Sequence, residues 1–133
     1  MRRIRRWLAC DRGDALIEGL FALVLVLLVV AVGAQALAYA HARSVAAAAA
    51  QDGARAAAAS GPEAGAVRAN AILNAAGGTG ASLRASAREQ GDEVTVSVEG
   101  EAPRLFSLPL LLPAVRASAS LPLERYPVAE AAP

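Results

Sequence analysis

Residues 19–34 read GLFALVLVLLVVAVGA, and this apolar stretch decides the fold of the chain. From Gly19 to Ala40 the only ionisable side chain is the phenol of Tyr39. At about 1.5 Å of rise per residue, a helix over that range would be roughly 33 Å long, against about 30 Å of hydrocarbon in a bilayer. The sequence therefore predicts one membrane-spanning helix.

The arginines around the span predict its orientation. Those before it outnumber those that follow it closely: Arg2, Arg3, Arg5, Arg6 and Arg12 precede it, and Arg43 and Arg55 follow. By the positive-inside rule, a basic leader at residues 1–13 is cytoplasmic and the rest of the chain lies outside. The formal net charge is +1 and no basic tract occurs outside the leader, so we expect no nucleic-acid partner.

A secretory signal peptide is the alternative interpretation of the same stretch. The apolar region of a signal peptide is usually about 7–15 residues long and ends at a small-residue cleavage site. The run here is longer, which favours a span, but the alanines that follow leave cleavage between Ala38 and Ala50 open. Cleavage there would release an exported soluble domain.

The spanning helix is expected to continue beyond the membrane as a stalk. Residues 45–60 are dominated by alanine, the strongest helix former, so we expect one transmembrane and stalk helix over residues 14–60. Gly53 weakens a helix by about 1 kcal/mol relative to alanine and is the predicted position of a bend.

Residues 61–80 predict a short second helix and a glycine-rich linker. Ser60 is followed three residues later by Glu63, which matches a capping box, and Pro62 suits the first turn of a helix. The helix is expected to end near Ala76, before a run of glycines. Its apolar stripe is weak, so it must dock on another part of the protein.

Beyond residue 80, apolar residues recur at every second position, as in a strand, and no longer at the three- and four-residue spacing of a helix. Residues 82–88 and 93–99 alternate apolar with polar side chains, which predicts an antiparallel hairpin with its turn at residues 88–93. Residues 115–121 alternate in the same way and predict a third strand. Because two strands alone are marginally stable, we expect all three to form one sheet that covers a helix.

These patterns together predict an α+β fold. It consists of a long N-terminal transmembrane helix that extends into a stalk, a short second helix, and a small antiparallel sheet of about three strands. The sheet belongs to a small exported β-rich domain at residues 81–123, and a loose tail at residues 124–133 follows it.

An apolar insert at residues 105–113, LFSLPLLLP, separates the second and third predicted strands. It is too short to span a membrane, and Pro109 and Pro113 argue against a central strand. We interpret it as a loop or short helix packed over the sheet. A hydrophobic loop that dips into the membrane is the alternative.

The segment directly before the span, Arg12-Gly13-Asp14-Ala15-Leu16-Ile17-Glu18, holds the main candidate functional residues. A carboxylate such as that of Glu18 costs about 2.5–3.5 kcal/mol at the centre of a membrane helix and less near the interface, unless it finds a partner. Glu18 either pairs with a positive charge or lies at headgroup depth near the positive end of its own helix. Gly13 either allows a protease to hold the adjoining peptide bond extended or is only a glycine before the helix.

No residue pattern predicts an enzyme. His41 is the only histidine and has no cysteine or acidic cluster at ligand spacing, so we expect no metal site. Cys10 and the serines lack a base partner for nucleophilic catalysis, and the glycines at residues 77–80 lack the lysine of a phosphate loop. We therefore expect no catalytic residues, no cofactor and no small-molecule substrate.

The leader motif resembles the class III signal of type IV pilin-like proteins, and residues 11–125 resemble the TadE-like family of minor pilins or pseudopilins from tight-adherence (Flp-type) pilus systems. Four features carry the resemblance: Arg12-Gly13 with Leu16-Ile17-Glu18, the following span, Gln51-Asp52-Gly53-Ala54-Arg55-Ala56-Ala57, and the 94–98 strand with the proline-bounded insert and the 115–121 strand.

The resemblance implies processing by an inner-membrane prepilin peptidase, which would cut between Gly13 and Asp14. Asp14 would become the new amino terminus, in place of the hydrophobic residue common in major pilins, and Glu18 the fifth residue of the mature chain. In this family the corresponding glutamate is thought to pair with the amino terminus of a neighbouring subunit during assembly. Glu18 is therefore the implied assembly residue.

The resemblance also implies partners and a location. They are other pilin-like subunits and the pilus assembly machinery, at the inner membrane, with the C-terminal domain extracytoplasmic. A minor subunit fits better than a major pilin, because major Flp pilins are much shorter and lack a sheet-bearing domain. The alternative is a single-pass anchor that is never cleaved and presents a small binding module to an envelope partner.

Overall fold

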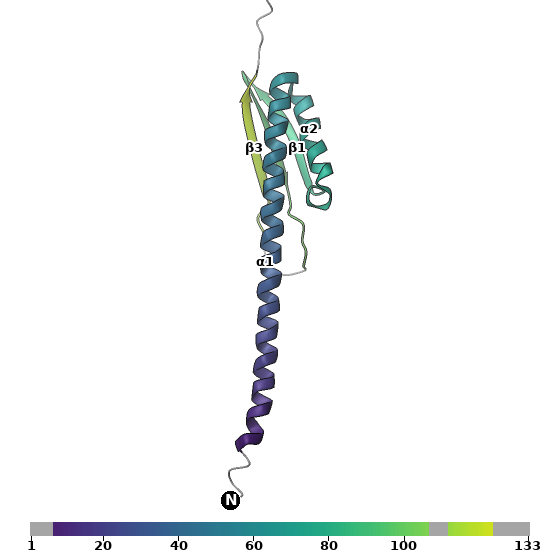
Figure 1. Ribbon diagram of the computed structural model, residues 1–133. Coiled ribbons are helices and arrows are strands. Elements are labelled where there is room, and N and C mark those ends of the chain that lie inside the picture. The colour runs from purple at the N-terminus through teal and green to yellow at the C-terminus, as the bar shows by residue number, and fades with distance from the viewer. Residues whose placement is uncertain (1–6, 107–111, 124–133) are drawn as a thin grey trace, which may run out of the picture. The chain divides into compact units, whose positions relative to one another are not determined.

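The computed structural model describes the backbone of residues 7–106 and 112–123, with side chains from residue 15 onward within those ranges. The predicted tail at residues 124–133, the first part of the leader and residues 107–111 of the apolar insert lie outside the described residues. The elements follow the order α1 (Trp7–Ser60), α2 (Pro62–Ala75), η2 (Gly77–Thr79), β1 (Leu83–Gln90), β2 (Glu93–Gly100) and β3 (Val115–Pro122) (Figure 1). The predicted α+β layout is confirmed.

The chain divides into two compact units, residues 1–36 and residues 37–133. The first contains most of the apolar half of α1, and its large side chains are exposed: Leu16 is 76% exposed and Phe21 is 72% exposed. The most apolar window of α1 has a mean hydropathy of 2.9, and none of it is buried. By length and composition this helix is sufficient to cross a membrane.

α1 begins earlier than the sequence analysis predicts. It starts at Trp7, within the basic leader, and not near Asp14. The segment before Asp14 contains good helix formers and no proline, so a single glycine at position 13 costs too little to stop the helix.

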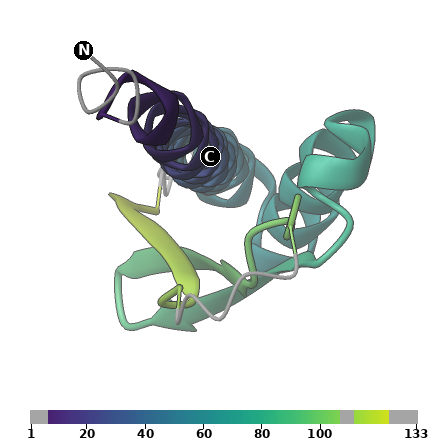
Figure 2. The ribbon, with the colours of Figure 1, turned by 90° about the horizontal axis from the view of Figure 1, so that it is seen from below.

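In the second unit, α1 presents a face made of small side chains. The buried residues of this face recur at three- and four-residue spacing, which places them on one side of a helix: Ala42, Ala46, Ala49, Ala50, Gly53, Ala54 and Ala57. They share a core with Leu73 of α2, and with Val94, Val96, Val98 and Val115 of the sheet. Within this unit the two helices lie on the same face of the sheet (Figure 2).

The sheet is antiparallel and has the order β1-β2-β3. All three valines of β2 are fully buried, as their alternation predicts, and Val96 lies between Ala87 of β1 and Ala119 of β3. Fully burying one such side chain contributes about 1.5–3 kcal/mol, so the middle strand supplies much of the stability of this unit.

The predicted hairpin turn is shorter than expected. β1 continues to Gln90 and β2 begins at Glu93, so only Gly91 and Asp92 connect the two strands. Gly91 has a φ of 65°, a conformation that glycine adopts without steric cost and that two-residue hairpin loops require.

The predicted capping box at Ser60 is wrong. Ser60 is the last residue of α1, and Gly61, with a φ of 93°, takes the N-cap position of α2 without a side-chain cap hydrogen bond. The Gly61 amide donates to the carbonyl of Ala57 at 2.8 Å, so the chain turns at the glycine and Ser60 lies one residue too early to cap. Pro62 occupies the first turn, as predicted.

α1 runs without interruption through Gly53, the position of the predicted bend. This glycine is the point at which α2 approaches most closely. A Cβ atom added at Gly53 would lie 2.9 Å from the Ala69 Cβ and 2.9 Å from the Gly65 carbonyl oxygen, and one added at Gly65 would lie 2.7 Å from the Gly53 carbonyl oxygen. The two helices therefore cross at backbone contact through two Gly-x-x-x-Ala pairs, Gly53 with Ala57 and Gly65 with Ala69.

Asn70 of α2 joins this helix to the outer edge of β1. Its Nδ2 donates to the Ala85 carbonyl at 3.1 Å and to the Ala66 carbonyl at 2.8 Å, and its Oδ1 accepts from the Ala85 amide at 3.1 Å. The side-chain amide thus pairs with Ala85 as a residue of a neighbouring strand would. This contact satisfies backbone groups that an edge strand otherwise leaves open.

We expect Gly65→Ala to destabilise the second unit by up to about 2 kcal/mol, because the added methyl meets backbone that cannot move away, at an overpacking cost of about 1–3 kcal/mol. The gain in helix propensity, about 1 kcal/mol, is smaller than the upper part of that range. Amide hydrogen exchange of β2 in the full-length protein in micelles measures the change. Gly78→Ala is the matched control, since its Cβ would enter open space, and equal protection in the two variants would contradict the close crossing.

We expect Asn70→Ala to speed amide exchange at Ala85 and to lower the stability of this unit by about 1–3 kcal/mol, because a part-buried amide and carbonyl lose their partner. Asn74→Ala, at an exposed position one turn further along α2, is the control. Unchanged exchange at Ala85 in the Asn70 variant would show that the helix does not protect this edge.

Candidate functional site

The candidate processing site lies in the early part of α1. Gly13 and Asp14 are both in helical conformation, and their side chains fall outside the described residues. The peptide bond between them is therefore in a helical turn, so a peptidase that binds extended substrate must first unwind it. Glycine makes that unwinding easier, since it is about 1 kcal/mol less favourable than alanine within a helix.

Glu18 lies one helical turn beyond Asp14, on the same side of α1. Its side chain is exposed, and the neighbouring large side chains, Leu16, Ile17, Leu20 and Phe21, are exposed too. Among the residues whose side chains are described, none forms a hydrogen bond or ion pair with Glu18. The structure thus presents this carboxylate outward, at the edge of an apolar helical surface.

The Gly13, Asp14 and Glu18 group is brought together by helical spacing alone. No other described segment of the first unit packs over it, because the large apolar side chains around Glu18 are open. A carboxylate in such surroundings is stabilised by water, by lipid headgroups or by a cation from another chain.

The second sequence motif, residues 51–57, lies at the crossing of α1 and α2. Asp52 Oδ1 is 2.7 Å from Arg55 Nη1 on the same helix, and Asp52 Oδ2 is 3.5 Å from Arg68 Nη2 on α2. These exposed ion pairs contribute at most about 1 kcal/mol each. The motif therefore has an evident structural role: its glycine and alanines form the crossing, and its charges line the rim.

Arg68 and Asn70 are contact residues that the sequence analysis did not identify. Both project from α2 toward partners that are distant in sequence, Asp52 and Ala85 respectively. The only local signal was that each lies off the weak apolar stripe of α2, which is equally true of solvated positions. Recognising their roles requires knowing that α2 folds back along both α1 and β1.

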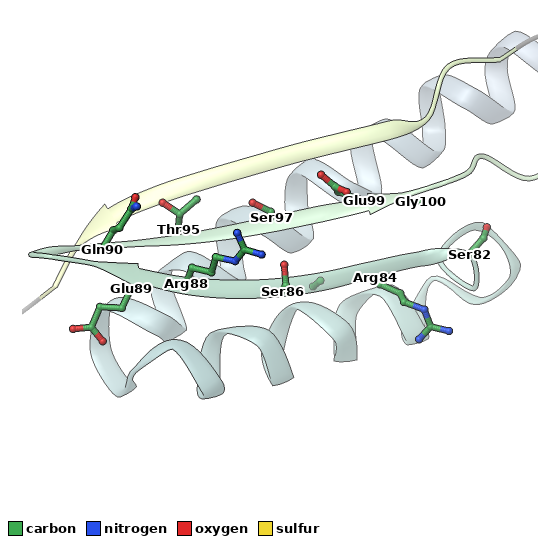
Figure 3. A pocket seen from close by; sticks show the side chains of 11 residues that line it. Ser82, Arg84, Ser86, Arg88, Glu89, Gln90, Thr95, Ser97, Glu99 and Gly100 are labelled. Carbon is green, nitrogen blue, oxygen red and sulfur yellow. The ribbon is translucent and has the colours of Figure 1, made fainter.

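The outer face of the hairpin carries an open hollow of about 930 Å³ (Figure 3). Outward-facing side chains of β1 and β2 form most of it, among them Arg84, Ser86, Arg88, Thr95 and Ser97. Nearby on the same face, Thr95 and Ser120 share a hydrogen bond of 2.8 Å between their hydroxyl oxygens. The hollow is the solvated face of the sheet, and in its middle the guanidinium of Arg88 lies between Ser86 and Ser97 (Figure 3).

Within the part of the chain that the structure describes, no group of three or more histidine, cysteine, aspartate or glutamate side chains could hold a metal ion. His41, the histidine considered above, is exposed on α1.

Comparisons of the chain with protein-family models, with curated proteins and with solved structures found no match.

Proposed function

We propose that this chain is a TadE-like minor pilin or pseudopilin, a subunit that a prepilin peptidase processes and that supports assembly of a tight-adherence pilus or a related secretion apparatus. One observation carries the proposal: Arg12-Gly13 and Glu18 lie near the start of a single continuous helix, α1. The first part of this helix is apolar and exposed, and its last part belongs to the second unit, which we call the head. A helix of this kind can be stored in a membrane and later associate through its exposed surface.

In this proposal the leader is cytoplasmic, the apolar part of α1 lies in the inner membrane, and the head is extracytoplasmic. The arginine-rich leader supports that orientation. After cleavage, the amine of Asp14 and the carboxylate of Glu18 provide opposite charges one turn apart on each subunit. Neighbouring subunits that are offset along the helix axis pair the amine of one with the carboxylate of the other. The partners are pilin-like subunits and the assembly machinery.

A second candidate function is an uncleaved single-pass anchor that presents the head to an envelope partner. The observation that favours it is the continuity of α1 through Gly13 and Asp14, since the bond to be cut is held in a helix. Both candidates need the span, and they differ in the amino terminus of the protein in the cell.

We expect the protein extracted from membranes to begin at Asp14 when a prepilin peptidase is co-expressed, and to keep the leader without it. Gly13→Leu should abolish cleavage, because a large side chain no longer fits beside the cut bond. Intact mass and amino-terminal sequencing measure the outcome. Gly19→Leu is the control, because a Cβ there meets open space. A leader retained under all conditions supports the uncleaved anchor, and a terminus between Ala38 and Ala50 supports signal cleavage.

We expect Glu18→Gln to be cleaved normally but to be incorporated poorly. If the carboxylate pairs with a neighbouring amine, the amount of mature chain recovered in sheared filaments should fall about tenfold, the effect of losing roughly 1.4 kcal/mol. Glu63→Gln, at an exposed position on α2, is the control. Equal recovery of the two variants would remove Glu18 from assembly.

A further inference from the structure

The outward face of the sheet carries polar side chains in rows that cross its strands. Two neighbouring rows occupy its middle, one made of Ser86, Ser97 and Ser118 and the other of Arg88, Thr95 and Ser120. Neither row contains an acidic side chain. The middle of this face therefore carries the positive charge of Arg88 among hydroxyl groups, in the hollow of about 930 Å³ described above.

The guanidinium of Arg88 has no partner among the described residues. It lies between the Ser86 and Ser97 side chains (Figure 3), and it forms no ion pair or hydrogen bond with them or with any other described residue. Arg116, on the same face, differs in this respect, because its Nε lies 4.0 Å from Oε1 of Glu99. The hydroxyls of Ser86 and Ser97 also form no side-chain hydrogen bond within the described ranges. Three neighbouring side chains thus present donors that the described part of the protein does not use.

The acidic residues around Arg88 form no ion pair with it. Its cross-strand neighbour is Thr95, and the outward-facing acids of β2, Glu93 and Glu99, lie at the two ends of that strand. Glu89 follows Arg88 in sequence but points away from the middle of the hollow (Figure 3). Opposite charges at facing positions stabilise a strand pair, and Arg88 lacks such a partner. Its charge is therefore available to an anion from outside the chain.

The arrangement suits an anion with more than two oxygens. A guanidinium group presents its N–H donors as a planar fork that binds two oxygens of one anion. Ser86 and Ser97 face each other across the strands, with about 4.5–5.5 Å between their Cβ atoms, so their hydroxyls can donate to further oxygens of the same anion. A carboxylate has only two oxygens, whereas phosphate and sulfate groups are tetrahedral and have more. None of the residues that line the hollow is aromatic, so a nucleobase has no ring on which to stack.

We propose that Arg88, Ser86 and Ser97 form a binding site for a tetrahedral oxyanion, a phosphate or sulfate group. The guanidinium donates to two of its oxygens, and the two hydroxyls donate to the others. The hollow is open to solvent, so the site admits a group carried on a larger molecule as well as a free ion. The site goes beyond the proposed function and lies within the second unit, so it does not depend on how that unit is anchored or assembled.

Amide chemical shifts of the full-length protein test the site. The protein is kept in dodecyl maltoside micelles, because this detergent carries no phosphate and no charge. Inorganic phosphate, sulfate and acetate are each titrated at constant ionic strength, balanced with sodium chloride. We expect phosphate and sulfate to shift the amides of Ser86, Arg88 and Ser97 to saturation, and acetate to bind at least about fivefold more weakly, because it leaves the hydroxyls without a partner. Acetate that binds as tightly as phosphate would overturn the tetrahedral ligand.

Substitutions separate a built site from the general attraction of anions to positive charge. Arg88→Gln should weaken phosphate binding about tenfold, at the lower end for hydrogen bonds to a charged group, because the site is open to water. Arg88→Lys should weaken it too, since an ammonium group keeps the charge without the planar fork. Arg84→Gln is the matched control: it removes the same charge from the same strand, and the Arg84 side chain points away from the middle of the hollow (Figure 3). The amide spectrum shows that each variant is folded.

Unchanged affinity in Arg84→Gln together with the loss in Arg88→Gln supports the site. An equal loss in these two variants, or full affinity in Arg88→Lys, would show attraction to charge alone and overturn it. Shifts that saturate with neither phosphate nor sulfate would overturn it as well. Glycerol 3-phosphate separates the two sources of phosphate: affinity equal to that of inorganic phosphate supports a group carried on a larger molecule, and binding of the inorganic ion alone supports a free ion.

Discussion

The close contact between the small-residue face of α1 and the valines of β2 determines how the elements of the head pack together. Alanine side chains fill little space, so the sheet and α2 must approach the helix closely for the core to be free of voids. Val96 lies beside Gly53 at the centre of this contact, and α2 reaches the same glycine from the other side through Gly65. Every other element is placed by these contacts: β1 and β3 flank β2, and α2 closes the remaining side.

One helix carries two kinds of surface, and this division underlies the proposed function. In the first unit the exposed side chains are mostly leucine and valine, whereas in the second the buried ones are alanine and glycine. Large apolar side chains suit a lipid environment, because removing more apolar area from water lowers the free energy of the protein. Small ones suit a protein partner at backbone distance. Position along α1 thus separates an exposed surface of large apolar side chains from the small-residue surface that packs in the second unit, without any break in the helix.

The sequence predicts the elements well and the contacts between them poorly. The valines of β2 alternate so regularly that strand, face and burial follow from the period alone, and the alanine run predicts that α1 continues to Ser60. The errors share one cause, since they concern residues whose role depends on tertiary contacts. Gly53 looks like a weak point until α2 is placed against it, and Ser60 looks like a cap until Gly61 takes the turn. Asn70 has no partner in sequence, because Ala85 becomes its neighbour only when β1 lies beside α2.

The pairing of Asn70 with Ala85 makes the two edges of the sheet unequal. Copies of a protein can join through their sheets into a long polymer only if each molecule has two unpaired edge strands, one for each neighbour. Here Asn70 of α2 already pairs with the amide and carbonyl of Ala85 on the β1 edge. A strand from another copy that adds at Ala85 therefore has to displace the Asn70 side chain, which makes addition at this edge less favourable.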